Sequence, residues 1–301
     1  MIVNRSRGVI ALTVAGVAWG TSVPLSKVAL TWLDPGWLTA VRFALAAAVL
    51  LAVVRCQWAG WQKLRAAFSW QVLAWGAAGY GGAVLMQNYG VARTSVTHAA
   101  LLIGAGPVLI AVLTALWRHV VARPLAWAGF AVSLAGVAAV AGGAGGGASA
   151  AGDALVLTST ALIAAMTVAQ SRLLRDRDPV AVTAIQFGGA ALATLPVAAC
   201  TSGLPAAPAG AGPVFAVIAL TAAATLLPFT LFAYGQRRVP AEVAGAFLNL
   251  EPLVGAAIGI VAFGDPFGPR QLLGGACIVA GIALSSLPAL RGRAPALAAA
   301  A

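Results

Sequence analysis

The chain has 301 residues, of which 61% are hydrophobic and only 8% are charged, and its formal net charge is +11. A soluble domain keeps about a quarter of its residues charged because its surface faces water, so this composition excludes an ordinary soluble protein. The basic residues lie between apolar runs and not along one exposed stripe, which argues against nucleic-acid binding. Cys56, Cys200 and Cys277 lie far apart, which excludes a disulfide framework and a cysteine-based metal site.

Ten apolar stretches follow one another along the chain, and each is close to the length of about 20 residues that a helix needs to cross a bilayer. In chain order they are 8–30, 36–54, 70–91, 96–117, 125–142, 153–172, 180–200, 213–235, 241–263 and 271–289. Asp-Pro pairs at 34–35, 178–179 and 265–266 mark breaks between them, because proline resists helix continuation. The pattern predicts an all-α integral membrane protein.

Lysine and arginine residues gather on one side of these spans. With the N-terminus in the cytoplasm, the cytoplasmic segments contain all but four of the 18 basic residues. Arg93 and Arg270 lie in outer loops, and Lys27 and Arg42 lie within spans. Because positive charge collects on cytoplasmic loops, we expect a protein of the cytoplasmic (inner) membrane with both termini in the cytoplasm. The number of spans is then even.

The two halves of the chain resemble each other. A shift of 145 residues aligns, without a gap, Tyr89-Gly90 with Tyr234-Gly235, Pro107 with Pro252, Pro124 with Pro269, Gly129 with Gly274 and Gly136 with Gly281. A shift of 144 residues aligns the Asp-Pro pairs at 34–35 and 178–179. We therefore expect a first repeat at 1–142 (spans 1–5), a Gly-rich connector at 143–152, a second repeat at 153–290 (spans 6–10) and a cytoplasmic tail at 291–301.

Five spans in each repeat force the second repeat to insert upside down. The predicted fold is therefore ten transmembrane helices arranged as two inverted five-helix repeats. Many secondary transporters have this architecture, with the binding site near the middle of the membrane between the halves. Two similar halves can exchange conformations and so open the site to alternate sides.

Several motifs in order resemble a known family. The stretch WGTSVPLSKVAL, followed by DPGWLTAVRF and YGVARTSVTHAALLIGAGPV, is similar to the first half of an EamA-type carrier of the drug/metabolite transporter superfamily. The stretches AEVAGAFLNLEPLVGAAIG and QLLGGACIVAGIAL are similar to the second half. Asp265 stands where the family often has glutamate, and Trp117-Arg118 stands where a Gly-Glu pair is common. The resemblance implies a ten-helix carrier, commonly an exporter of amino acids or other metabolites.

Charges inside the spans are candidates for function because their desolvation is costly. Glu251, beside Pro252, is the only carboxylate near the middle of a span. It is either a proton site or a fixed partner for a backbone N–H or a cation, and we favour the structural role. Arg42 either holds a substrate carboxylate, or snorkels to the interface or pairs with Asp34. For Lys27 we favour the structural alternatives.

Neutral polar and aromatic residues are the remaining candidates for a substrate site. Those predicted to face the middle of the membrane are Trp19, Ser22, Tyr80, Gln87, Met166, Gln170 and Asn249. A pocket of such residues suits an amphipathic or aromatic solute better than a sugar phosphate, which requires clustered cations. The alternative is ordinary helix packing. Because tryptophan prefers the membrane interface, the position of Trp19 near the middle of the membrane slightly favours a pocket.

Two further features concern the membrane interface and the oligomeric state of the protein. His98, at the outer start of the fourth span, is expected to be a wet side chain at the interface. GxxxG patterns at Gly16/Gly20 and Gly255/Gly259 allow close helix contact but are weak evidence of dimerisation, so we expect a monomer or a weak homodimer.

The sequence contains no GxxxxGK[ST], HExxH or GxSxG pattern, so we expect no nucleotide, metal or other cofactor and no hydrolase activity. The leading hypothesis is a secondary transporter that exports small neutral or aromatic amino acids or related metabolites by alternating access. The first alternative is a broad efflux carrier for hydrophobic cations. A membrane enzyme or a pore fits the repeat less well.

Overall fold

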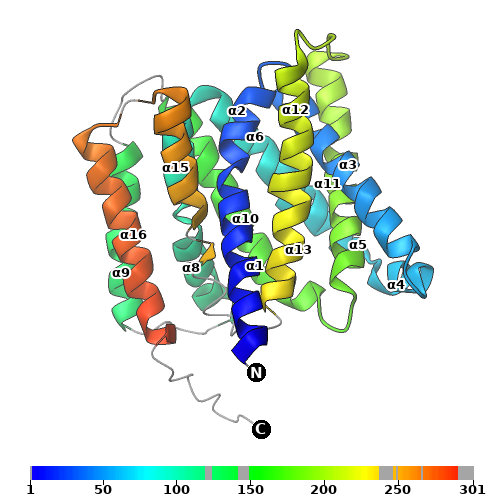
Figure 1. The fold of residues 1–301 in the computed structure, drawn as a ribbon, viewed down its shortest axis with the longest axis horizontal. Coiled ribbons are helices and arrows are strands. Elements are labelled where there is room, and N and C mark those ends of the chain that lie inside the picture. Colours follow the sequence, from blue (N-terminus) through cyan, green and yellow to red (C-terminus); the bar gives the residue numbers. More distant parts are fainter. Residues whose placement is uncertain are drawn as a thin grey trace.

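The computed structural model describes residues 2–118, 124–141, 149–236, 247–248, 250–265 and 267–290. Within these ranges all regular structure is helical, as predicted (Figure 1). Asn249, the predicted tail at 291–301 and most of the predicted connector at 143–152 lie outside the described residues. The first half of the predicted span 241–263 also lies outside them, apart from residues 247 and 248.

The described helices lie over the predicted spans, except α4, which lies between the second and third spans. Those before residue 142 are α1 (Ile2–Gly20), α2 (Ser22–Ala29), α3 (Pro35–Arg55), α4 (Gly60–Ala67), α5 (Trp70–Trp75), the π-helical η1 (Gly76–Gly82), α6 (Ala83–Arg93), α7 (Val96–Ile103), α8 (Gly106–Arg118) and α9 (Pro124–Ala141). Those after residue 149 are α10 (Ala150–Leu173), α11 (Pro179–Ser202), α12 (Ala211–Thr221), the π-helical η2 (Ala222–Leu226), α13 (Leu227–Gln236), α15 (Leu250–Phe263) and α16 (Pro269–Leu290).

Six helical stretches of the described chain are long and apolar enough to cross a membrane. They are Ser6–Ala29, Pro35–Arg55, Val96–Trp117, Ala150–Gln170, Pro179–Ser202 and Ala211–Phe232. Two shorter apolar helices cover Trp127–Gly136 and Leu250–Phe263. Large apolar side chains such as Leu192, Phe215 and Val261 are exposed on the outside of these helices. A surface with so many exposed apolar side chains is suited to lipid.

The Asp-Pro pairs start helices where the sequence predicts breaks. The Asp34 carboxylate accepts from the backbone N–H groups of Gly36 (2.8 Å) and Trp37 (3.2 Å), and Asp178 accepts from Ala181 (2.9 Å). Proline fits the first turn because its missing N–H would have no partner there. Asp265 differs, because its carboxylate accepts from the backbone N–H of Thr97 in α7 (2.7 Å).

The most extensive helix contacts join the two halves of the chain. The pairs are α9 with α16, α3 with α11, α6 with α10, α1 with α13 and α7 with α15. Gly136 of α9 faces the carbonyl oxygen of Gly274 in α16, and Gly281 of α16 faces the carbonyl oxygen of Gly129 in α9. The repeat aligns Gly136 with Gly281 and Gly129 with Gly274, so this contact is reciprocal, as in a two-fold arrangement.

Both GxxxG patterns make contacts inside the chain. Gly16 packs against Phe247 and Leu250, and Gly20 packs against Val254 of α15. In α15, Gly255 faces Ala100 and Gly259 faces Thr97, both in α7. These glycines therefore allow helix contacts within one chain, where a Cβ atom would collide with a neighbour.

We expect Gly136→Ala and Gly281→Ala to destabilise the protein by about 1–3 kcal/mol, because each added methyl group would meet backbone of the facing helix. Gly188→Ala in α11 is the matched control, because open space surrounds that position and alanine favours a helix. Thermal unfolding of the purified protein in detergent should give lower midpoints for the first two variants only. Equal midpoints for all three variants would contradict the α9–α16 contact.

Candidate functional site

Within the described residues, the helical backbone is irregular at five places in the predicted spans. Thr21 forms a turn between α1 and α2, and Gly104 and Ala105 form a turn between α7 and α8. The π-helical segments η1 and η2 interrupt the third and eighth spans, and α15 begins at Leu250 after a turn at Leu248. A shift of 145 residues places η1 over residues 221–227, which contain η2. Segments of π-helix are frequent at functional sites. Non-helical backbone at membrane depth is tolerated only where protein or a water-filled cavity covers it.

Aromatic side chains meet where these irregular segments lie. We call Trp19, Phe43, Tyr80, Phe187, Phe229 and Phe232 the aromatic cluster. The ring of Trp19 contacts Phe229 and Phe232 edge-on, both with centroids 5.3 Å apart. Tyr80 of η1 lies 5.3 Å from Phe187 and 5.7 Å from Phe229. The cluster thus joins α1, α3, η1, α11 and α13.

A cavity of about 340 Å³ borders the aromatic cluster. It is lined by Leu50, Asp178, Pro179, Val180, Thr183, Phe187, Leu226, Phe229, Thr230 and Tyr234. Phe187 and Phe229 belong to both the cavity wall and the cluster. The remaining lining residues lie toward the side of the molecule on which α3 ends and α11 begins. Its volume is at the lower end of the range of small-molecule sites, and its wall is mostly apolar with a few polar groups.

The structure brings some predicted site residues together and separates others. Trp19 and Tyr80 both contact Phe229. Ser22 is buried at the start of α2, and Gln87 is half-buried in α6. Asn249 lies outside the described residues.

The two candidates of α10 contact other elements. Met166 is buried against Gly79 of η1. The side-chain amides of Gln170 and Gln186 donate to each other, at 3.2 and 2.9 Å. Gln186 is aligned with Arg42 by the shift of 144 residues, so both repeats place a polar side chain at this point of the α3–α11 contact.

Arg42 points into the interior. Its Nε donates to the Thr225 hydroxyl (2.7 Å) and its Nη2 approaches the Ala224 carbonyl (3.4 Å), both in η2. The guanidinium carbon lies 5.7 Å from the centroid of the Phe43 ring. Arg42 thus makes neither of the contacts expected of a structural role: it does not reach the interface, and the Asp34 carboxylate is occupied with capping α3.

Lys27 has a structural role, as we favoured, but with other partners. Its ammonium group donates to the carbonyl oxygens of Val91 (2.7 Å) and Thr94 (2.8 Å). These carbonyls lie at the end of α6, where the last turn leaves acceptors without helical partners. Lys27 therefore caps α6 from α2.

Glu251 lies in the first turn of α15, and the Cα of Gly20 faces its backbone carbonyl. The Glu251 carboxylate interacts electrostatically with the Arg42 guanidinium. Within the described part of the chain the two groups make no ion pair at 4 Å or less. One acid and one base thus face the same interior region without direct contact.

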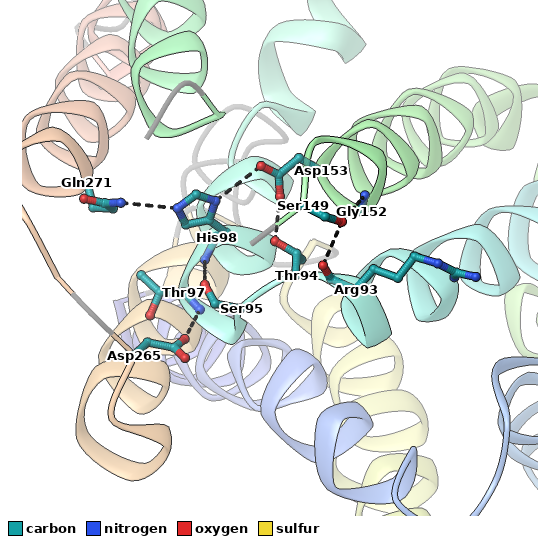
Figure 2. A network of polar contacts seen from close by, with 10 residues as sticks. All are labelled: Arg93, Thr94, Ser95, Thr97, His98, Ser149, Gly152, Asp153, Asp265 and Gln271. Carbon is teal, nitrogen blue, oxygen red and sulfur yellow. Dashed lines mark hydrogen bonds and ion pairs between the residues drawn. The ribbon is translucent and has the colours of Figure 1, made fainter. Parts of the chain in front are cut away.

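A buried network joins α7, α10 and α16 (Figure 2). It lies near the starts of these helices, whereas the cavity lies near the end of α3 and the start of α11. His98 is only 2% exposed, so the expectation of a wet interfacial histidine is wrong. Its Nδ1 lies 3.3 Å from the Asp153 carboxylate and its Nε2 lies 3.3 Å from the Gln271 amide nitrogen. The Thr94 hydroxyl donates to the same carboxylate (2.6 Å). A proton on Nδ1 would let a neutral imidazole donate to Asp153 and accept from Gln271.

Sequence reasoning missed this network, although one signal was present. Asp153 stands at the start of a long apolar stretch, where a carboxylate is costly unless it is paired. We call these residues the outer network, after the side on which the sequence predicts them to lie: Thr94, Thr97, His98, Asp153, Asp265 and Gln271.

Comparisons with known proteins agree with this fold. One relative, from Streptantibioticus cattleyicolor, is named a probable terminal-alkyne amino-acid exporter and is 27% identical over 290 residues, which is 93% of each chain. An uncharacterised transporter from Archaeoglobus fulgidus is 37% identical over 68 residues, so the match spans 23% of this chain and 25% of that protein. A solved crystal structure with 23% identity covers 95% of this chain and 98% of its own, with a TM-score of 0.69, and supports the fold alone.

The model of the EamA-like transporter family matches the chain twice, at residues 6–142 and 150–287. These matches cover most of the sequence and correspond to two repeated halves. The chain therefore belongs to the EamA-like transporter family: it is a multi-pass helical membrane protein that transports a small molecule and is not an enzyme.

Proposed function

We propose that the protein is a secondary carrier that exports small neutral or aromatic amino acids, or related metabolites, across the cytoplasmic membrane by alternating access. The observation that carries the proposal is the aromatic cluster, with a cavity on one side and the buried outer network on the other. An apolar, ring-lined site suits the side chain of such a solute. The name of the S. cattleyicolor relative supports export of an amino acid.

The proposed architecture is ten transmembrane helices in two inverted five-helix repeats. It has the repeats at 1–142 and 153–290, the connector at 143–152 and the tail at 291–301. The reciprocal α9–α16 contact and the matching positions of η1 and η2 support it. In Figure 1, α1 begins and α16 ends on the same side, as an even number of spans requires.

The proposed orientation follows from charge. The positive-inside rule places both termini and the end of α3 in the cytoplasm, so the cavity faces the cytoplasm. The outer network then closes the opposite side, which corresponds to an inward-facing state. The proposed substrate-binding residues lie beyond the cavity wall described above, and they are Trp19, Ser22, Tyr80, Gln87, Met166, Gln170 and Asn249.

Efflux of hydrophobic cations is the second candidate. The aromatic cluster favours it, because ring faces attract cations. The positive charge of Arg42 beside Phe43 opposes it. We expect a monomer or a weak homodimer, because both GxxxG patterns are used within the chain.

Counterflow in proteoliposomes is the experiment that tests the proposed function. Vesicles loaded with unlabelled phenylalanine should transiently accumulate labelled phenylalanine above its equilibrium level, because a carrier exchanges one solute for another. A pore would give equilibration without accumulation. If a panel of neutral and aromatic amino acids gives no counterflow while cationic dyes do, the cation carrier replaces the proposed function.

Trp19→Ala and Tyr80→Ala should each weaken binding of an aromatic amino acid about tenfold, because one stacked aromatic pair contributes about 0.5–1.5 kcal/mol beyond its buried area. Phe215→Ala is the control, since that ring is exposed on the outside of α12. Titration calorimetry on the purified variants measures the change. Unchanged affinity in both site variants would exclude the aromatic cluster as the substrate site.

Asp153→Asn should favour opening of the outer side, because it weakens a charge-assisted hydrogen bond of about 1.5–3 kcal/mol to His98. A cysteine at position 22, in a variant without the native cysteines, should then react several-fold faster with an impermeant maleimide added outside cells. Thr158→Val is the control, because among the described residues that hydroxyl donates to the Ala154 carbonyl within α10 and takes no part in the network. Equal labelling rates in the two variants would show that the outer network does not keep the outer side closed.

A further inference from the structure

The guanidinium of Arg42 has unused hydrogen-bonding capacity. An arginine carries five N–H donors, and among the described residues only Nε has a short bond, while Nη2 reaches the Ala224 carbonyl at 3.4 Å. The residue is nevertheless only 6% exposed. A charge at this depth is expensive unless it is paired, and such residues commonly mark substrate pathways. The remaining donors are available to an anionic group, because no carboxylate of the described residues lies within ion-pair distance of them.

The guanidinium is held in one position before any ligand arrives. The Thr225 hydroxyl donates to the Leu220 carbonyl (2.8 Å), so its oxygen lone pairs are free to accept from Arg42 Nε. Thr225 belongs to η2, and Leu220 belongs to the last turn of α12. A fixed guanidinium loses little freedom when it binds a carboxylate through two parallel N–H groups.

The groups around Arg42 match the rest of an amino acid. Phe43 lies beside the guanidinium and contacts Tyr80 and Phe187 of the aromatic cluster. Glu251 acts on the same guanidinium from α15 without direct contact. Among the described residues, the Glu251 side chain has no hydrogen-bond partner of its own. The interior thus offers a guanidinium, a carboxyl group and an apolar wall.

We propose that Arg42 binds the α-carboxylate of the substrate, that Glu251 binds its α-ammonium group, and that the aromatic cluster receives its side chain. The proposal rests on the proposed function and narrows it: the carrier selects zwitterionic amino acids over amines and over simple carboxylic acids. A zwitterion supplies one partner for each charge, whereas an amine leaves Arg42 unpaired and an acid leaves Glu251 unpaired.

The test compares four ligands on the purified protein by titration calorimetry. Phenylalanine carries both charges, phenylalaninamide and phenethylamine lack the carboxylate, and 3-phenylpropionate lacks the ammonium group. The wild type should bind phenylalanine at least tenfold more tightly than the other three, since removing one partner of a buried charged group is costly.

Variants of the two residues test which charged group of the substrate each residue binds. Arg42→Gln should weaken the binding of phenylalanine about tenfold or more, and it should change the affinity for phenethylamine by no more than about threefold. Glu251→Gln should weaken the binding of phenylalanine, and it should change the affinity for 3-phenylpropionate by no more than about threefold. Thr225→Val, which removes the positioning hydroxyl, should have an intermediate effect on the ligands that carry a carboxylate.

Two results would overturn the proposal while the proposed function stands. One is wild-type protein that exchanges phenylalanine but binds phenylalaninamide or 3-phenylpropionate equally well. The other is a folded Arg42→Gln protein that loses all four ligands alike, as expected if Arg42 and Glu251 only stabilise the helices. If Arg42→Gln does not fold, the wild-type ligand series decides. If no amino acid binds or exchanges, the proposed function fails and this inference fails with it.

Discussion

Hydrocarbon offers no partner to a backbone N–H or C=O group, so a chain that crosses it many times must satisfy these groups within its own helices. This constraint explains where the protein is regular and where it is not. Helices such as α3 and α11 run without interruption over more than 20 residues. The segment η1 packs against α11, η2 contacts α1 and α3 as well as its neighbours α12 and α13, and Gly20, beside the turn at Thr21, packs against α15.

Packing between the halves permits these irregular segments. The Cα of Gly76 in η1 faces the backbone of Gln186, and Arg42 donates to Thr225 of η2. Each half thus covers the widened backbone of the other. The same contacts place the aromatic cluster and Arg42 in the interior, and Arg42 makes no ion pair at 4 Å or less with any residue that the structure describes.

Much of this organisation could be predicted from the sequence, because it follows from length and period. Apolar runs of about 20 residues located the spans, and Asp-Pro pairs located the starts of α3 and α11. The spacing of Gly136 and Gly281 indicated the repeat whose contact the structure makes reciprocal. Trp19 and Tyr80 were predicted to face the interior, and both lie in the aromatic cluster.

The unpredicted features depend on contacts between residues far apart in the chain. His98 is buried only because Asp153 and Gln271, from two other helices, supply its partners. Lys27 finds the carbonyls at the end of α6 and not a nearby carboxylate. The π-helical segments have no strong local signal, since GAAGYGG and AAATL differ in composition. Such pairings require the three-dimensional fold.

The central claim is that the two halves exchange conformations around an interior site. Spin labels at Cys56 and position 234 report the inner side, and labels at positions 92 and 267 report the outer side, with the other native cysteines replaced. Pulsed electron resonance in lipid nanodiscs, with and without phenylalanine, measures both distances. The account predicts that the substrate populates a state with a shorter inner and a longer outer distance. Distances that stay fixed, or that lengthen together, would contradict alternating access.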